Sequence, residues 1–120
     1  MAKLVKLTSS QIIEINKVIG EGGTILNKAN FEQMIDKLEY TEEMLSYATT
    51  LLHDIISLHA FLNGNKRTAF YAMVTFLELN NVKFKYDKSE IDVVGNYLNK
   101  IALGEVNRNQ IQKWIKKMIE

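Results

Sequence analysis

Two predicted helices of this 120-residue chain meet at the run His59-Ala60-Phe61-Leu62-Asn63-Gly64-Asn65-Lys66-Arg67-Thr68-Ala69. Its middle, Asn63-Gly64-Asn65, consists of residue types that tolerate unusual backbone angles, so a tight turn is expected there. After the turn, apolar residues recur at helical spacing, at Ala69, Ala72, Met73, Phe76 and Leu77. A helix is therefore expected to begin at Asn65, directly after the turn.

The start of that helix carries two positive charges, Lys66 and Arg67. Cations at a helix start oppose the helix dipole, at a cost of a few tenths to about 1 kcal/mol each. Stability alone would favour Asp or Glu there, whereas a bound anion would explain the cations, because local rules tend to break at functional sites. Backbone N–H groups at a helix start bind anions, and arginine clamps phosphate through two parallel hydrogen bonds. The run therefore predicts a phosphate-binding site.

A proton acceptor precedes this site, because His59 ends the preceding helical pattern. An imidazole can take up a proton at neutral pH, and a positioned base typically contributes a factor of about 10²–10⁴ to a rate. Phe61 is the apolar side chain expected to anchor the loop between the two helices. A histidine that faces a phosphate site suggests phosphoryl or nucleotidyl transfer.

The rest of the chain predicts an all-α scaffold of about six helices. The first begins at Thr8, where Gln11 completes a capping box, and ends at Gly20. The others are expected to begin at Asn30, Thr41, Asn65, Ser89 and Asn107. Residues 82–86 (Val-Lys-Phe-Lys-Tyr) alternate like a strand, and we expect a short β-like flap there. Without proline, linker or repeat, residues 1–120 are expected to form one compact bundle with this short extended segment.

The composition, 47% hydrophobic and 24% charged, is that of an ordinary globular protein. A formal net charge of +1 gives no sign of a nucleic-acid or membrane partner, and the absence of cysteine excludes disulfides and thiolate metal sites. No apolar run reaches membrane-spanning length, and residues 1–6 lack the apolar stretch of a signal peptide. We therefore expect a cytoplasmic protein with no direct nucleic-acid partner and no membrane.

The run from His59 to Ala69 resembles the core motif of the Fic/Doc superfamily, whose Fic branch has the pattern H-P-F-x-[D/E]-G-N-G-R-x-x-R. It is more similar to the Doc (death-on-curing) branch, because Lys66 stands where Fic enzymes have glycine and Phe70 where they have a second arginine. The resemblance covers essentially the whole chain, including a terminal segment at residues 111–115. Doc proteins are the toxins of toxin–antitoxin modules.

This resemblance implies a role for each motif residue. His59 would activate the target hydroxyl, while Gly64, Asn65 and Arg67 would bind nucleotide phosphates. Doc proteins are understood as kinases that bind ATP in an orientation inverted relative to Fic enzymes and transfer its γ-phosphate; Lys66 fits that mode. Asn63 replaces the family's acidic metal ligand, and its neutral oxygen is a weaker ligand for Mg²⁺. Magnesium is then expected mainly through phosphates and water.

The resemblance also implies partners. The expected target is a serine or threonine hydroxyl of a translation elongation factor, with elongation factor Tu suggested by the family, so that translation would be arrested. A Phd-like antitoxin would fold its C-terminal segment into a groove on the toxin. The nearest match to the inhibitory pattern [S/T]-x-x-x-E-[G/N] of self-regulated Fic proteins is Ser10…Glu14, which fails at Ile15. Internal inhibition is therefore expected to be absent.

Two other functions stay open. One is a Fic-type AMP transferase that acts on a protein hydroxyl, and the other is a catalytically weakened binding protein, because of Asn63. Other features have ordinary structural interpretations: His53 as a solvated or capping residue, Glu21-Gly22-Gly23 as an interhelical turn, and Trp114 as part of the core. Arg108 is left open as a residue that could face the ligand.

Overall fold

A computed structural model describes residues 3–120 and contains six α-helices and one short 3-10 turn. Their bounds are α1 Ser9–Val18, α2 Lys28–Tyr40, α3 Met44–Ser57, α4 Asn65–Leu79, the 3-10 turn η1 Lys88–Glu90, α5 Ile91–Ala102 and α6 Arg108–Ile119. The predicted all-α class is confirmed. None of the helices within residues 3–120 is long and apolar enough to cross a membrane.

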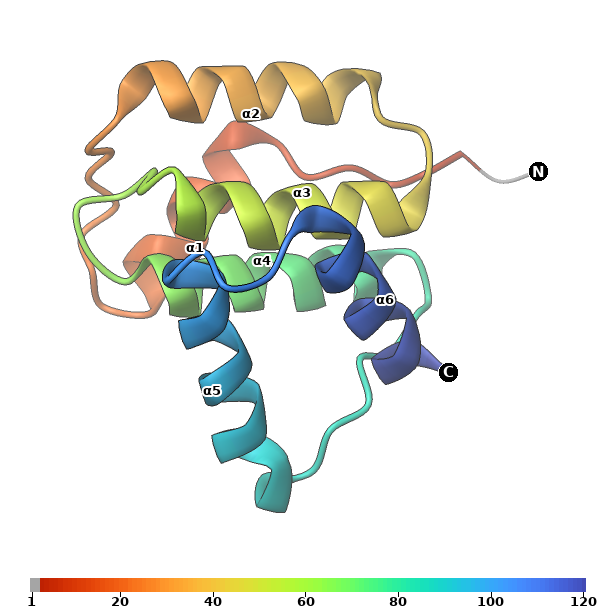
Figure 1. Cartoon of the computed structure of the whole chain (residues 1–120). Helices are drawn as coiled ribbons and strands as arrows, with labels where there is room; N and C mark the ends of the chain where they lie inside the picture. The colour runs from red at the N-terminus through yellow and green to blue at the C-terminus, as the bar shows by residue number, and fades with distance from the viewer. Residues whose placement is uncertain (1–2) are drawn as a thin grey trace.

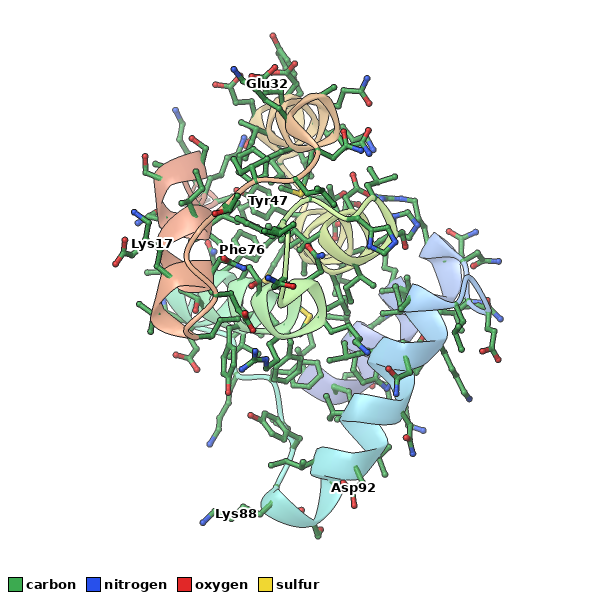
Figure 2. The ribbon with its side chains drawn as sticks, turned by 90° about the vertical axis from the view of Figure 1, so that its left-hand side faces the viewer. Lys17, Glu32, Tyr47, Phe76, Lys88 and Asp92 are labelled. Carbon is green, nitrogen blue, oxygen red and sulfur yellow. The ribbon has the colours of Figure 1, made fainter. Side chains whose placement is uncertain are left out.

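Helix α3 is the centre of the molecule, and α2, α4, α5 and α6 all pack against it (Figure 1). Its sequence is apolar on most sides, which is the pattern of a buried helix. Tyr47 of α3 stacks on Phe76 of α4 with ring centroids 4.1 Å apart, and Figure 2 shows both rings between the two helices. The Tyr47 hydroxyl accepts a hydrogen bond from the Leu7 N–H at 2.9 Å, which ties the segment before α1 to this core.

Capping side chains set the helix starts. Thr8 and Gln11 form the predicted capping box of α1, and Asn107 with Gln110 forms one at α6. Helix α2 begins earlier than predicted, because Asn27 is its cap. The Asn30 side chain instead donates to the Leu58 carbonyl at 3.1 Å, at the end of α3.

Two further starts were predicted wrongly. Glu43 caps α3, whereas Thr41 is the C-cap residue of α2 and its hydroxyl donates to the Lys37 carbonyl at 2.7 Å. Asp87 caps the 3-10 turn that leads into α5, so Ser89 lies inside this turn and is not the cap. In both cases the sequence contains the residue that caps the element, but it does not show which side chain lies within hydrogen-bond distance of the first turn.

The predicted flap at residues 82–86 is also wrong. The segment is irregular, and its Lys85 N–H donates to the Met118 carbonyl of α6 at 2.7 Å. The alternation arises because Phe84 is buried against Phe70 and Trp114, with centroids 5.4 Å away in each case. This aromatic packing produces a strand-like pattern without a partner strand. Trp114 is partly buried and packs against the core, in agreement with its interpretation from the sequence as a core residue.

Candidate active site

His59 occupies the position just past the end of α3 where many helices have glycine. Its φ is +47°, in the left-handed region. Its N–H points to the Ile56 carbonyl at 3.4 Å, while the Ala60 N–H returns to the Ile55 carbonyl at 3.3 Å, which is the bonding pattern of a Schellman motif. Histidine is among the residue types that tolerate this region best after glycine and asparagine. The turn leaves His59 exposed beside the following loop.

The loop after His59 is attached to the loop between α1 and α2 through backbone hydrogen bonds. The Leu26 N–H donates to the Ala60 carbonyl and the Leu62 N–H donates to the Thr24 carbonyl, both at 2.9 Å, around an isolated bridge between Ile25 and Phe61. Phe61 is fully buried and packs edge-on against Phe31, with centroids 5.7 Å apart. Phe61 therefore anchors the loop as predicted.

Asn65 closes the turn with its side chain. Its Oδ1 accepts from the Phe61 N–H at 2.8 Å and its Nδ2 donates to the Phe61 carbonyl at 2.9 Å. Gly64, with φ +72°, occupies the N-cap position of α4. Because the Asn65 amide is used in this way, what Asn65 can offer a ligand is its backbone N–H. The contribution of Asn65 to phosphate binding is therefore limited to its backbone, which is a narrower role than the sequence suggested.

The first turn of α4 is an uncapped helix start. No side chain among residues 3–120 caps it, and its first helical bond is the Thr68 N–H to the Gly64 carbonyl, at 2.8 Å. The preceding N–H groups of the turn therefore have no helical acceptor. Lys66 and Arg67 extend from this same turn. An anion placed here would meet free N–H groups, the positive end of the helix dipole and two cations.

The structure brings all six predicted site residues to one cavity of about 400 Å³, namely His59, Asn63, Gly64, Asn65, Lys66 and Arg67. Ala102 of α5 also lines this cavity. The cavity is therefore formed by the end of α3, the start of α4 and the end of α5. Of these three elements, α5 is the one whose contribution to the cavity the motif does not predict.

Arg67 is engaged by a carboxylate that sequence reasoning missed. Glu21 lies in the predicted interhelical turn, and its carboxylate forms an ion pair with the Arg67 guanidinium. Gly64 lies so close to Glu21 that an added Cβ would sit 2.6 Å from the Glu21 Cγ. An anion that binds Arg67 must therefore share the guanidinium with Glu21 or displace it.

Asn16 is a second residue that sequence reasoning missed. It is fully buried on α1. Its Nδ2 donates to the Asn63 carbonyl at 3.0 Å and the Thr68 hydroxyl at 2.9 Å, and its Oδ1 accepts from the Gly23 N–H at 2.8 Å. It thus fixes the motif turn and the loop that carries Glu21 relative to each other. A signal was present: Asn16 lies one turn after Ile12, on a stripe that is otherwise apolar.

The residues around Asp54 form a separate polar network between helices α2, α3 and α6. Asp54 is 1% exposed, and its carboxylate receives Lys37 at 2.8 Å, His53 Nδ1 at 2.7 Å and Arg108 at 3.3 Å. Arg108 also donates to the Thr50 hydroxyl at 2.7 Å. Burial alone would raise the pKa of Asp54, but the hydrogen bonds from His53 and Lys37, with the Lys37 charge, outweigh it and lower that pKa. His53 and Arg108 thus have structural partners.

The chemistry of the site offers a divalent metal little protein coordination. Residues 3–120 contain no cluster of three or more His, Cys, Asp or Glu side chains that could hold an ion. The Asn63 side chain is exposed at the cavity and presents a neutral amide oxygen. Magnesium commonly binds through one or two carboxylates with phosphate oxygens and water. The donor set therefore fits a metal carried mainly by a phosphate ligand.

Comparison with known proteins identifies the family. The family model of the Fic/DOC family matches residues 6–77, which run from the segment before α1 to near the end of α4 and include the motif. The chain is also 34% identical over 64 residues to Toxin Doc of Mycolicibacterium smegmatis, an alignment that covers 53% of this chain and 48% of that protein. The chain thus matches about half the length of this curated relative. It belongs to the Fic/DOC family, and its similarity to Toxin Doc places it on the Doc branch.

Proposed function

We propose that this protein is a Doc-type toxin that transfers the γ-phosphate of ATP to a serine or threonine hydroxyl of a protein. The observation that carries the proposal is the uncapped, doubly cationic start of α4, which shares one cavity with exposed His59. A helix start of this kind binds phosphate, and a histidine beside it can accept a proton. Family membership supports a transferase acting on protein hydroxyls.

The transfer step assigns one task to each group. The acceptor hydroxyl gives its proton to a ring nitrogen of His59 while its oxygen forms a bond to the γ-phosphorus. The bond between the γ-phosphorus and the β,γ-bridging oxygen breaks, and ADP leaves with that electron pair. The free N–H groups of α4, Arg67 and Lys66 stabilise the charge on the phosphate oxygens. A bound Mg²⁺, held by the phosphates and the Asn63 oxygen, would neutralise part of that charge.

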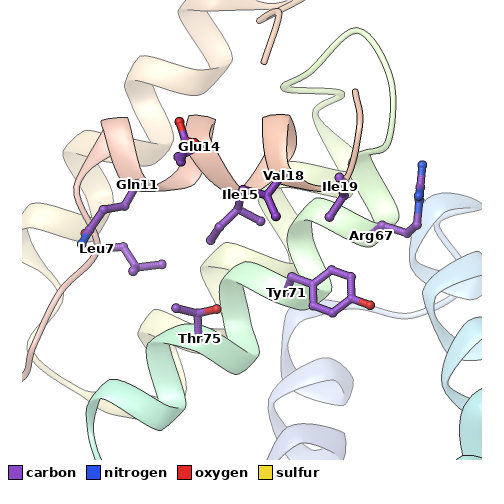
Figure 3. Close-up of a pocket in the computed structure, with 9 residues that line it drawn as sticks. All are labelled: Leu7, Gln11, Glu14, Ile15, Val18, Ile19, Arg67, Tyr71 and Thr75. Atoms are coloured by element: carbon purple, nitrogen blue, oxygen red, sulfur yellow. The ribbon is translucent and has the colours of Figure 1, made fainter. Parts of the chain in front are cut away.

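The target and the antitoxin are further parts of this proposal. The target is a translation factor, elongation factor Tu, modified in the cytoplasm so that translation stops. For the antitoxin, support comes from an apolar groove of about 640 Å³ between α1 and α4, lined by Leu7, Ile15, Val18, Ile19, Tyr71 and Thr75 among others (Figure 3). Arg67 lies at one end of this groove and also lines the cavity with His59. An amphipathic helical segment of a Phd-like antitoxin would cover the groove and reach the site.

The test is label transfer to proteins of a cell extract, from ATP labelled in the γ- or in the α-phosphate, with magnesium. The matched inactive variant is His59→Asn, because asparagine tolerates the left-handed backbone of this position better than alanine does. We expect γ-label on a protein of the size of a translation factor, lost in the variant. Transfer of α-label would indicate an AMP transferase, and no transfer, with manganese as well, would indicate a binding protein.

A further inference from the structure

Lys66 stands on the boundary between two cavities. It lines the cavity of about 400 Å³ that contains His59, and it also lines a neighbouring groove of about 370 Å³ between the start of α4 and α5. Its Nζ donates a 2.7 Å hydrogen bond to Asn99 Oδ1 on α5. The side chain therefore spans from α4 to α5 beside both spaces.

Asn99 holds this ammonium without neutralising it. An exposed lysine has four rotatable side-chain bonds and stays mobile unless a partner orders it. The partner of Arg67 is the carboxylate of Glu21, which cancels its charge, whereas the partner of Lys66 is a neutral amide oxygen. Lys66 is thus positioned beside the phosphate-binding turn by a partner that carries no charge of its own.

The face of α5 behind this contact leaves room for a ligand. Gly95, Asn99 and Ala102 follow one another at helical spacing on it. A Cβ added at Gly95 would meet no atom within 4 Å, so close packing against another part of residues 3–120 does not require this glycine. Glycine inside a helix costs roughly 0.5–1 kcal/mol relative to alanine. The groove is therefore open, and Lys66 lines both it and the cavity with His59, as does Arg67 of the same helix turn.

We propose that Asn99 is a positioning residue that keeps Lys66 across this boundary and thereby determines which phosphate of a bound nucleotide lies beside His59. With Lys66 held, the phosphate chain ends in the His59 cavity and presents its terminal phosphate. With Lys66 released, a nucleotide can extend its nucleoside into the α5 groove and present the α-phosphate. The second half of this proposal rests on the proposed phosphotransferase function. The first half, that Asn99 positions the Lys66 ammonium, does not depend on that function.

The experiment compares Asn99→Ala with Asn99→Asp and with the control Asn96→Ala, which changes a neighbouring residue of the same groove that makes no side-chain hydrogen bond to Lys66. Asn99→Ala removes the hydrogen bond to Lys66 but leaves the charge of the ammonium, whereas Asn99→Asp keeps an acceptor for Lys66 and neutralises that charge. Each variant is assayed for the ratio of γ- to α-label transferred from ATP. Each is also titrated with inorganic triphosphate in a calorimeter, a measurement that needs no catalysis.

We expect Asn99→Ala to weaken triphosphate binding roughly two- to tenfold, since the ligand must now order the lysine itself. The same variant should lower γ-transfer and let α-transfer appear. Asn99→Asp should weaken triphosphate binding at least as much but keep the γ-selectivity. A purely structural role of Asn99 would instead give the same label ratio in the aspartate and alanine variants. Asn96→Ala should resemble the unchanged protein.

Equal triphosphate affinity in Asn99→Ala and Asn96→Ala would overturn the positioning of Lys66. An unchanged label ratio in an active Asn99→Ala enzyme would overturn its effect on selectivity. If the unchanged protein transfers no label, the proposed function fails, and with it the claim about selectivity. The calorimetric comparison still decides whether Asn99 positions the ammonium.

Discussion

Gly64 and Gly104 have the same backbone angle in different surroundings. Both have φ +72°, but an added Cβ at Gly64 would sit 2.6 Å from the Glu21 Cγ, whereas at Gly104 it would meet nothing within 4 Å. A left-handed alanine costs roughly 1–2 kcal/mol, and overpacking adds about 1–3 kcal/mol. We expect Gly64→Ala to lower the free energy of unfolding by more than Gly104→Ala does, as measured by chemical denaturation.

A double substitution isolates the cause of that difference. In a Glu21→Ala background the steric conflict at Gly64 is absent, so the two alanine variants should become equally costly. If Gly64→Ala remains the worse of the two in that background, the contact with Glu21 is not what makes this position sensitive.

Asp54 predicts how stability depends on pH. Its pKa is lowered in the folded protein, so its contribution to stability is present above the unfolded pKa, about 3.9, and is lost as the pH falls through the folded pKa. Between pH 6 and pH 3, Asp54→Asn should show a shallower loss of unfolding free energy than the unchanged protein. At pH 7 it should be less stable by about 2 kcal/mol, below the 3–5 kcal/mol of a fully buried pair, because Lys37 and Arg108 can rehydrate. Equal slopes in the two denaturation series would contradict this.

At this scale the sequence predicted the residues that the structure gathers at one cavity, and it missed the residues that hold them there. His59 and Asn63 to Arg67 form one contiguous run, so their proximity needed only a turn. Asn16 was visible in principle as a polar residue on an apolar stripe. Glu21 and Asn99 were not, because each meets its cation across 46 and 33 residues, a distance that only the packing of α1 and α5 closes.

At the scale of the element, the start of α4 should be a point where stability and binding conflict. Lys66 lies in the first turn of this helix, where an acidic residue would interact favourably with the dipole. We expect Lys66→Glu to raise the free energy of unfolding by about 0.5 kcal/mol while triphosphate binding is lost. Lys28→Glu, in the first turn of α2, should leave binding unchanged and give a smaller gain in stability, because it also replaces the Lys28–Glu32 ion pair by two like charges. A stability loss in Lys66→Glu alone, measured by thermal unfolding, would contradict the dipole argument.

Helix existence was predictable here, but several starts were not. The starts at Thr8 and Asn107 were correct, and each of these residues forms a capping box in the structure. Asn30 and Thr41 are suitable caps by type, but each bonds a carbonyl of a neighbouring helix turn instead. Residues 82–86 show that alternation predicts alternating burial, which an aromatic cluster satisfies as well as a sheet does.

For the whole molecule, the groove between α1 and α4 predicts the antitoxin surface. Val18 lines this groove and is 77% exposed, while Val93 on α5 lies outside it and is 59% exposed. Surface substitutions of this kind change stability by less than about 0.5 kcal/mol. Val18→Asp should therefore abolish co-purification with the proposed antitoxin, and Val93→Asp should not. Equal retention of both variants would place the partner elsewhere.

The bridge between residues 24–26 and 60–62 has a consequence for how relatives diverge. Its hydrogen bonds join main-chain atoms alone, so they place few demands on the side chains of Thr24 and Leu26. Proline is the exception at Leu26 and Leu62, since each must supply an N–H. Descendants of one ancestor can therefore exchange the side chains at Thr24 and Leu26 while the path of the loop stays the same. Sequence identity should thus be lost at these two positions earlier than in the motif that the loop supports.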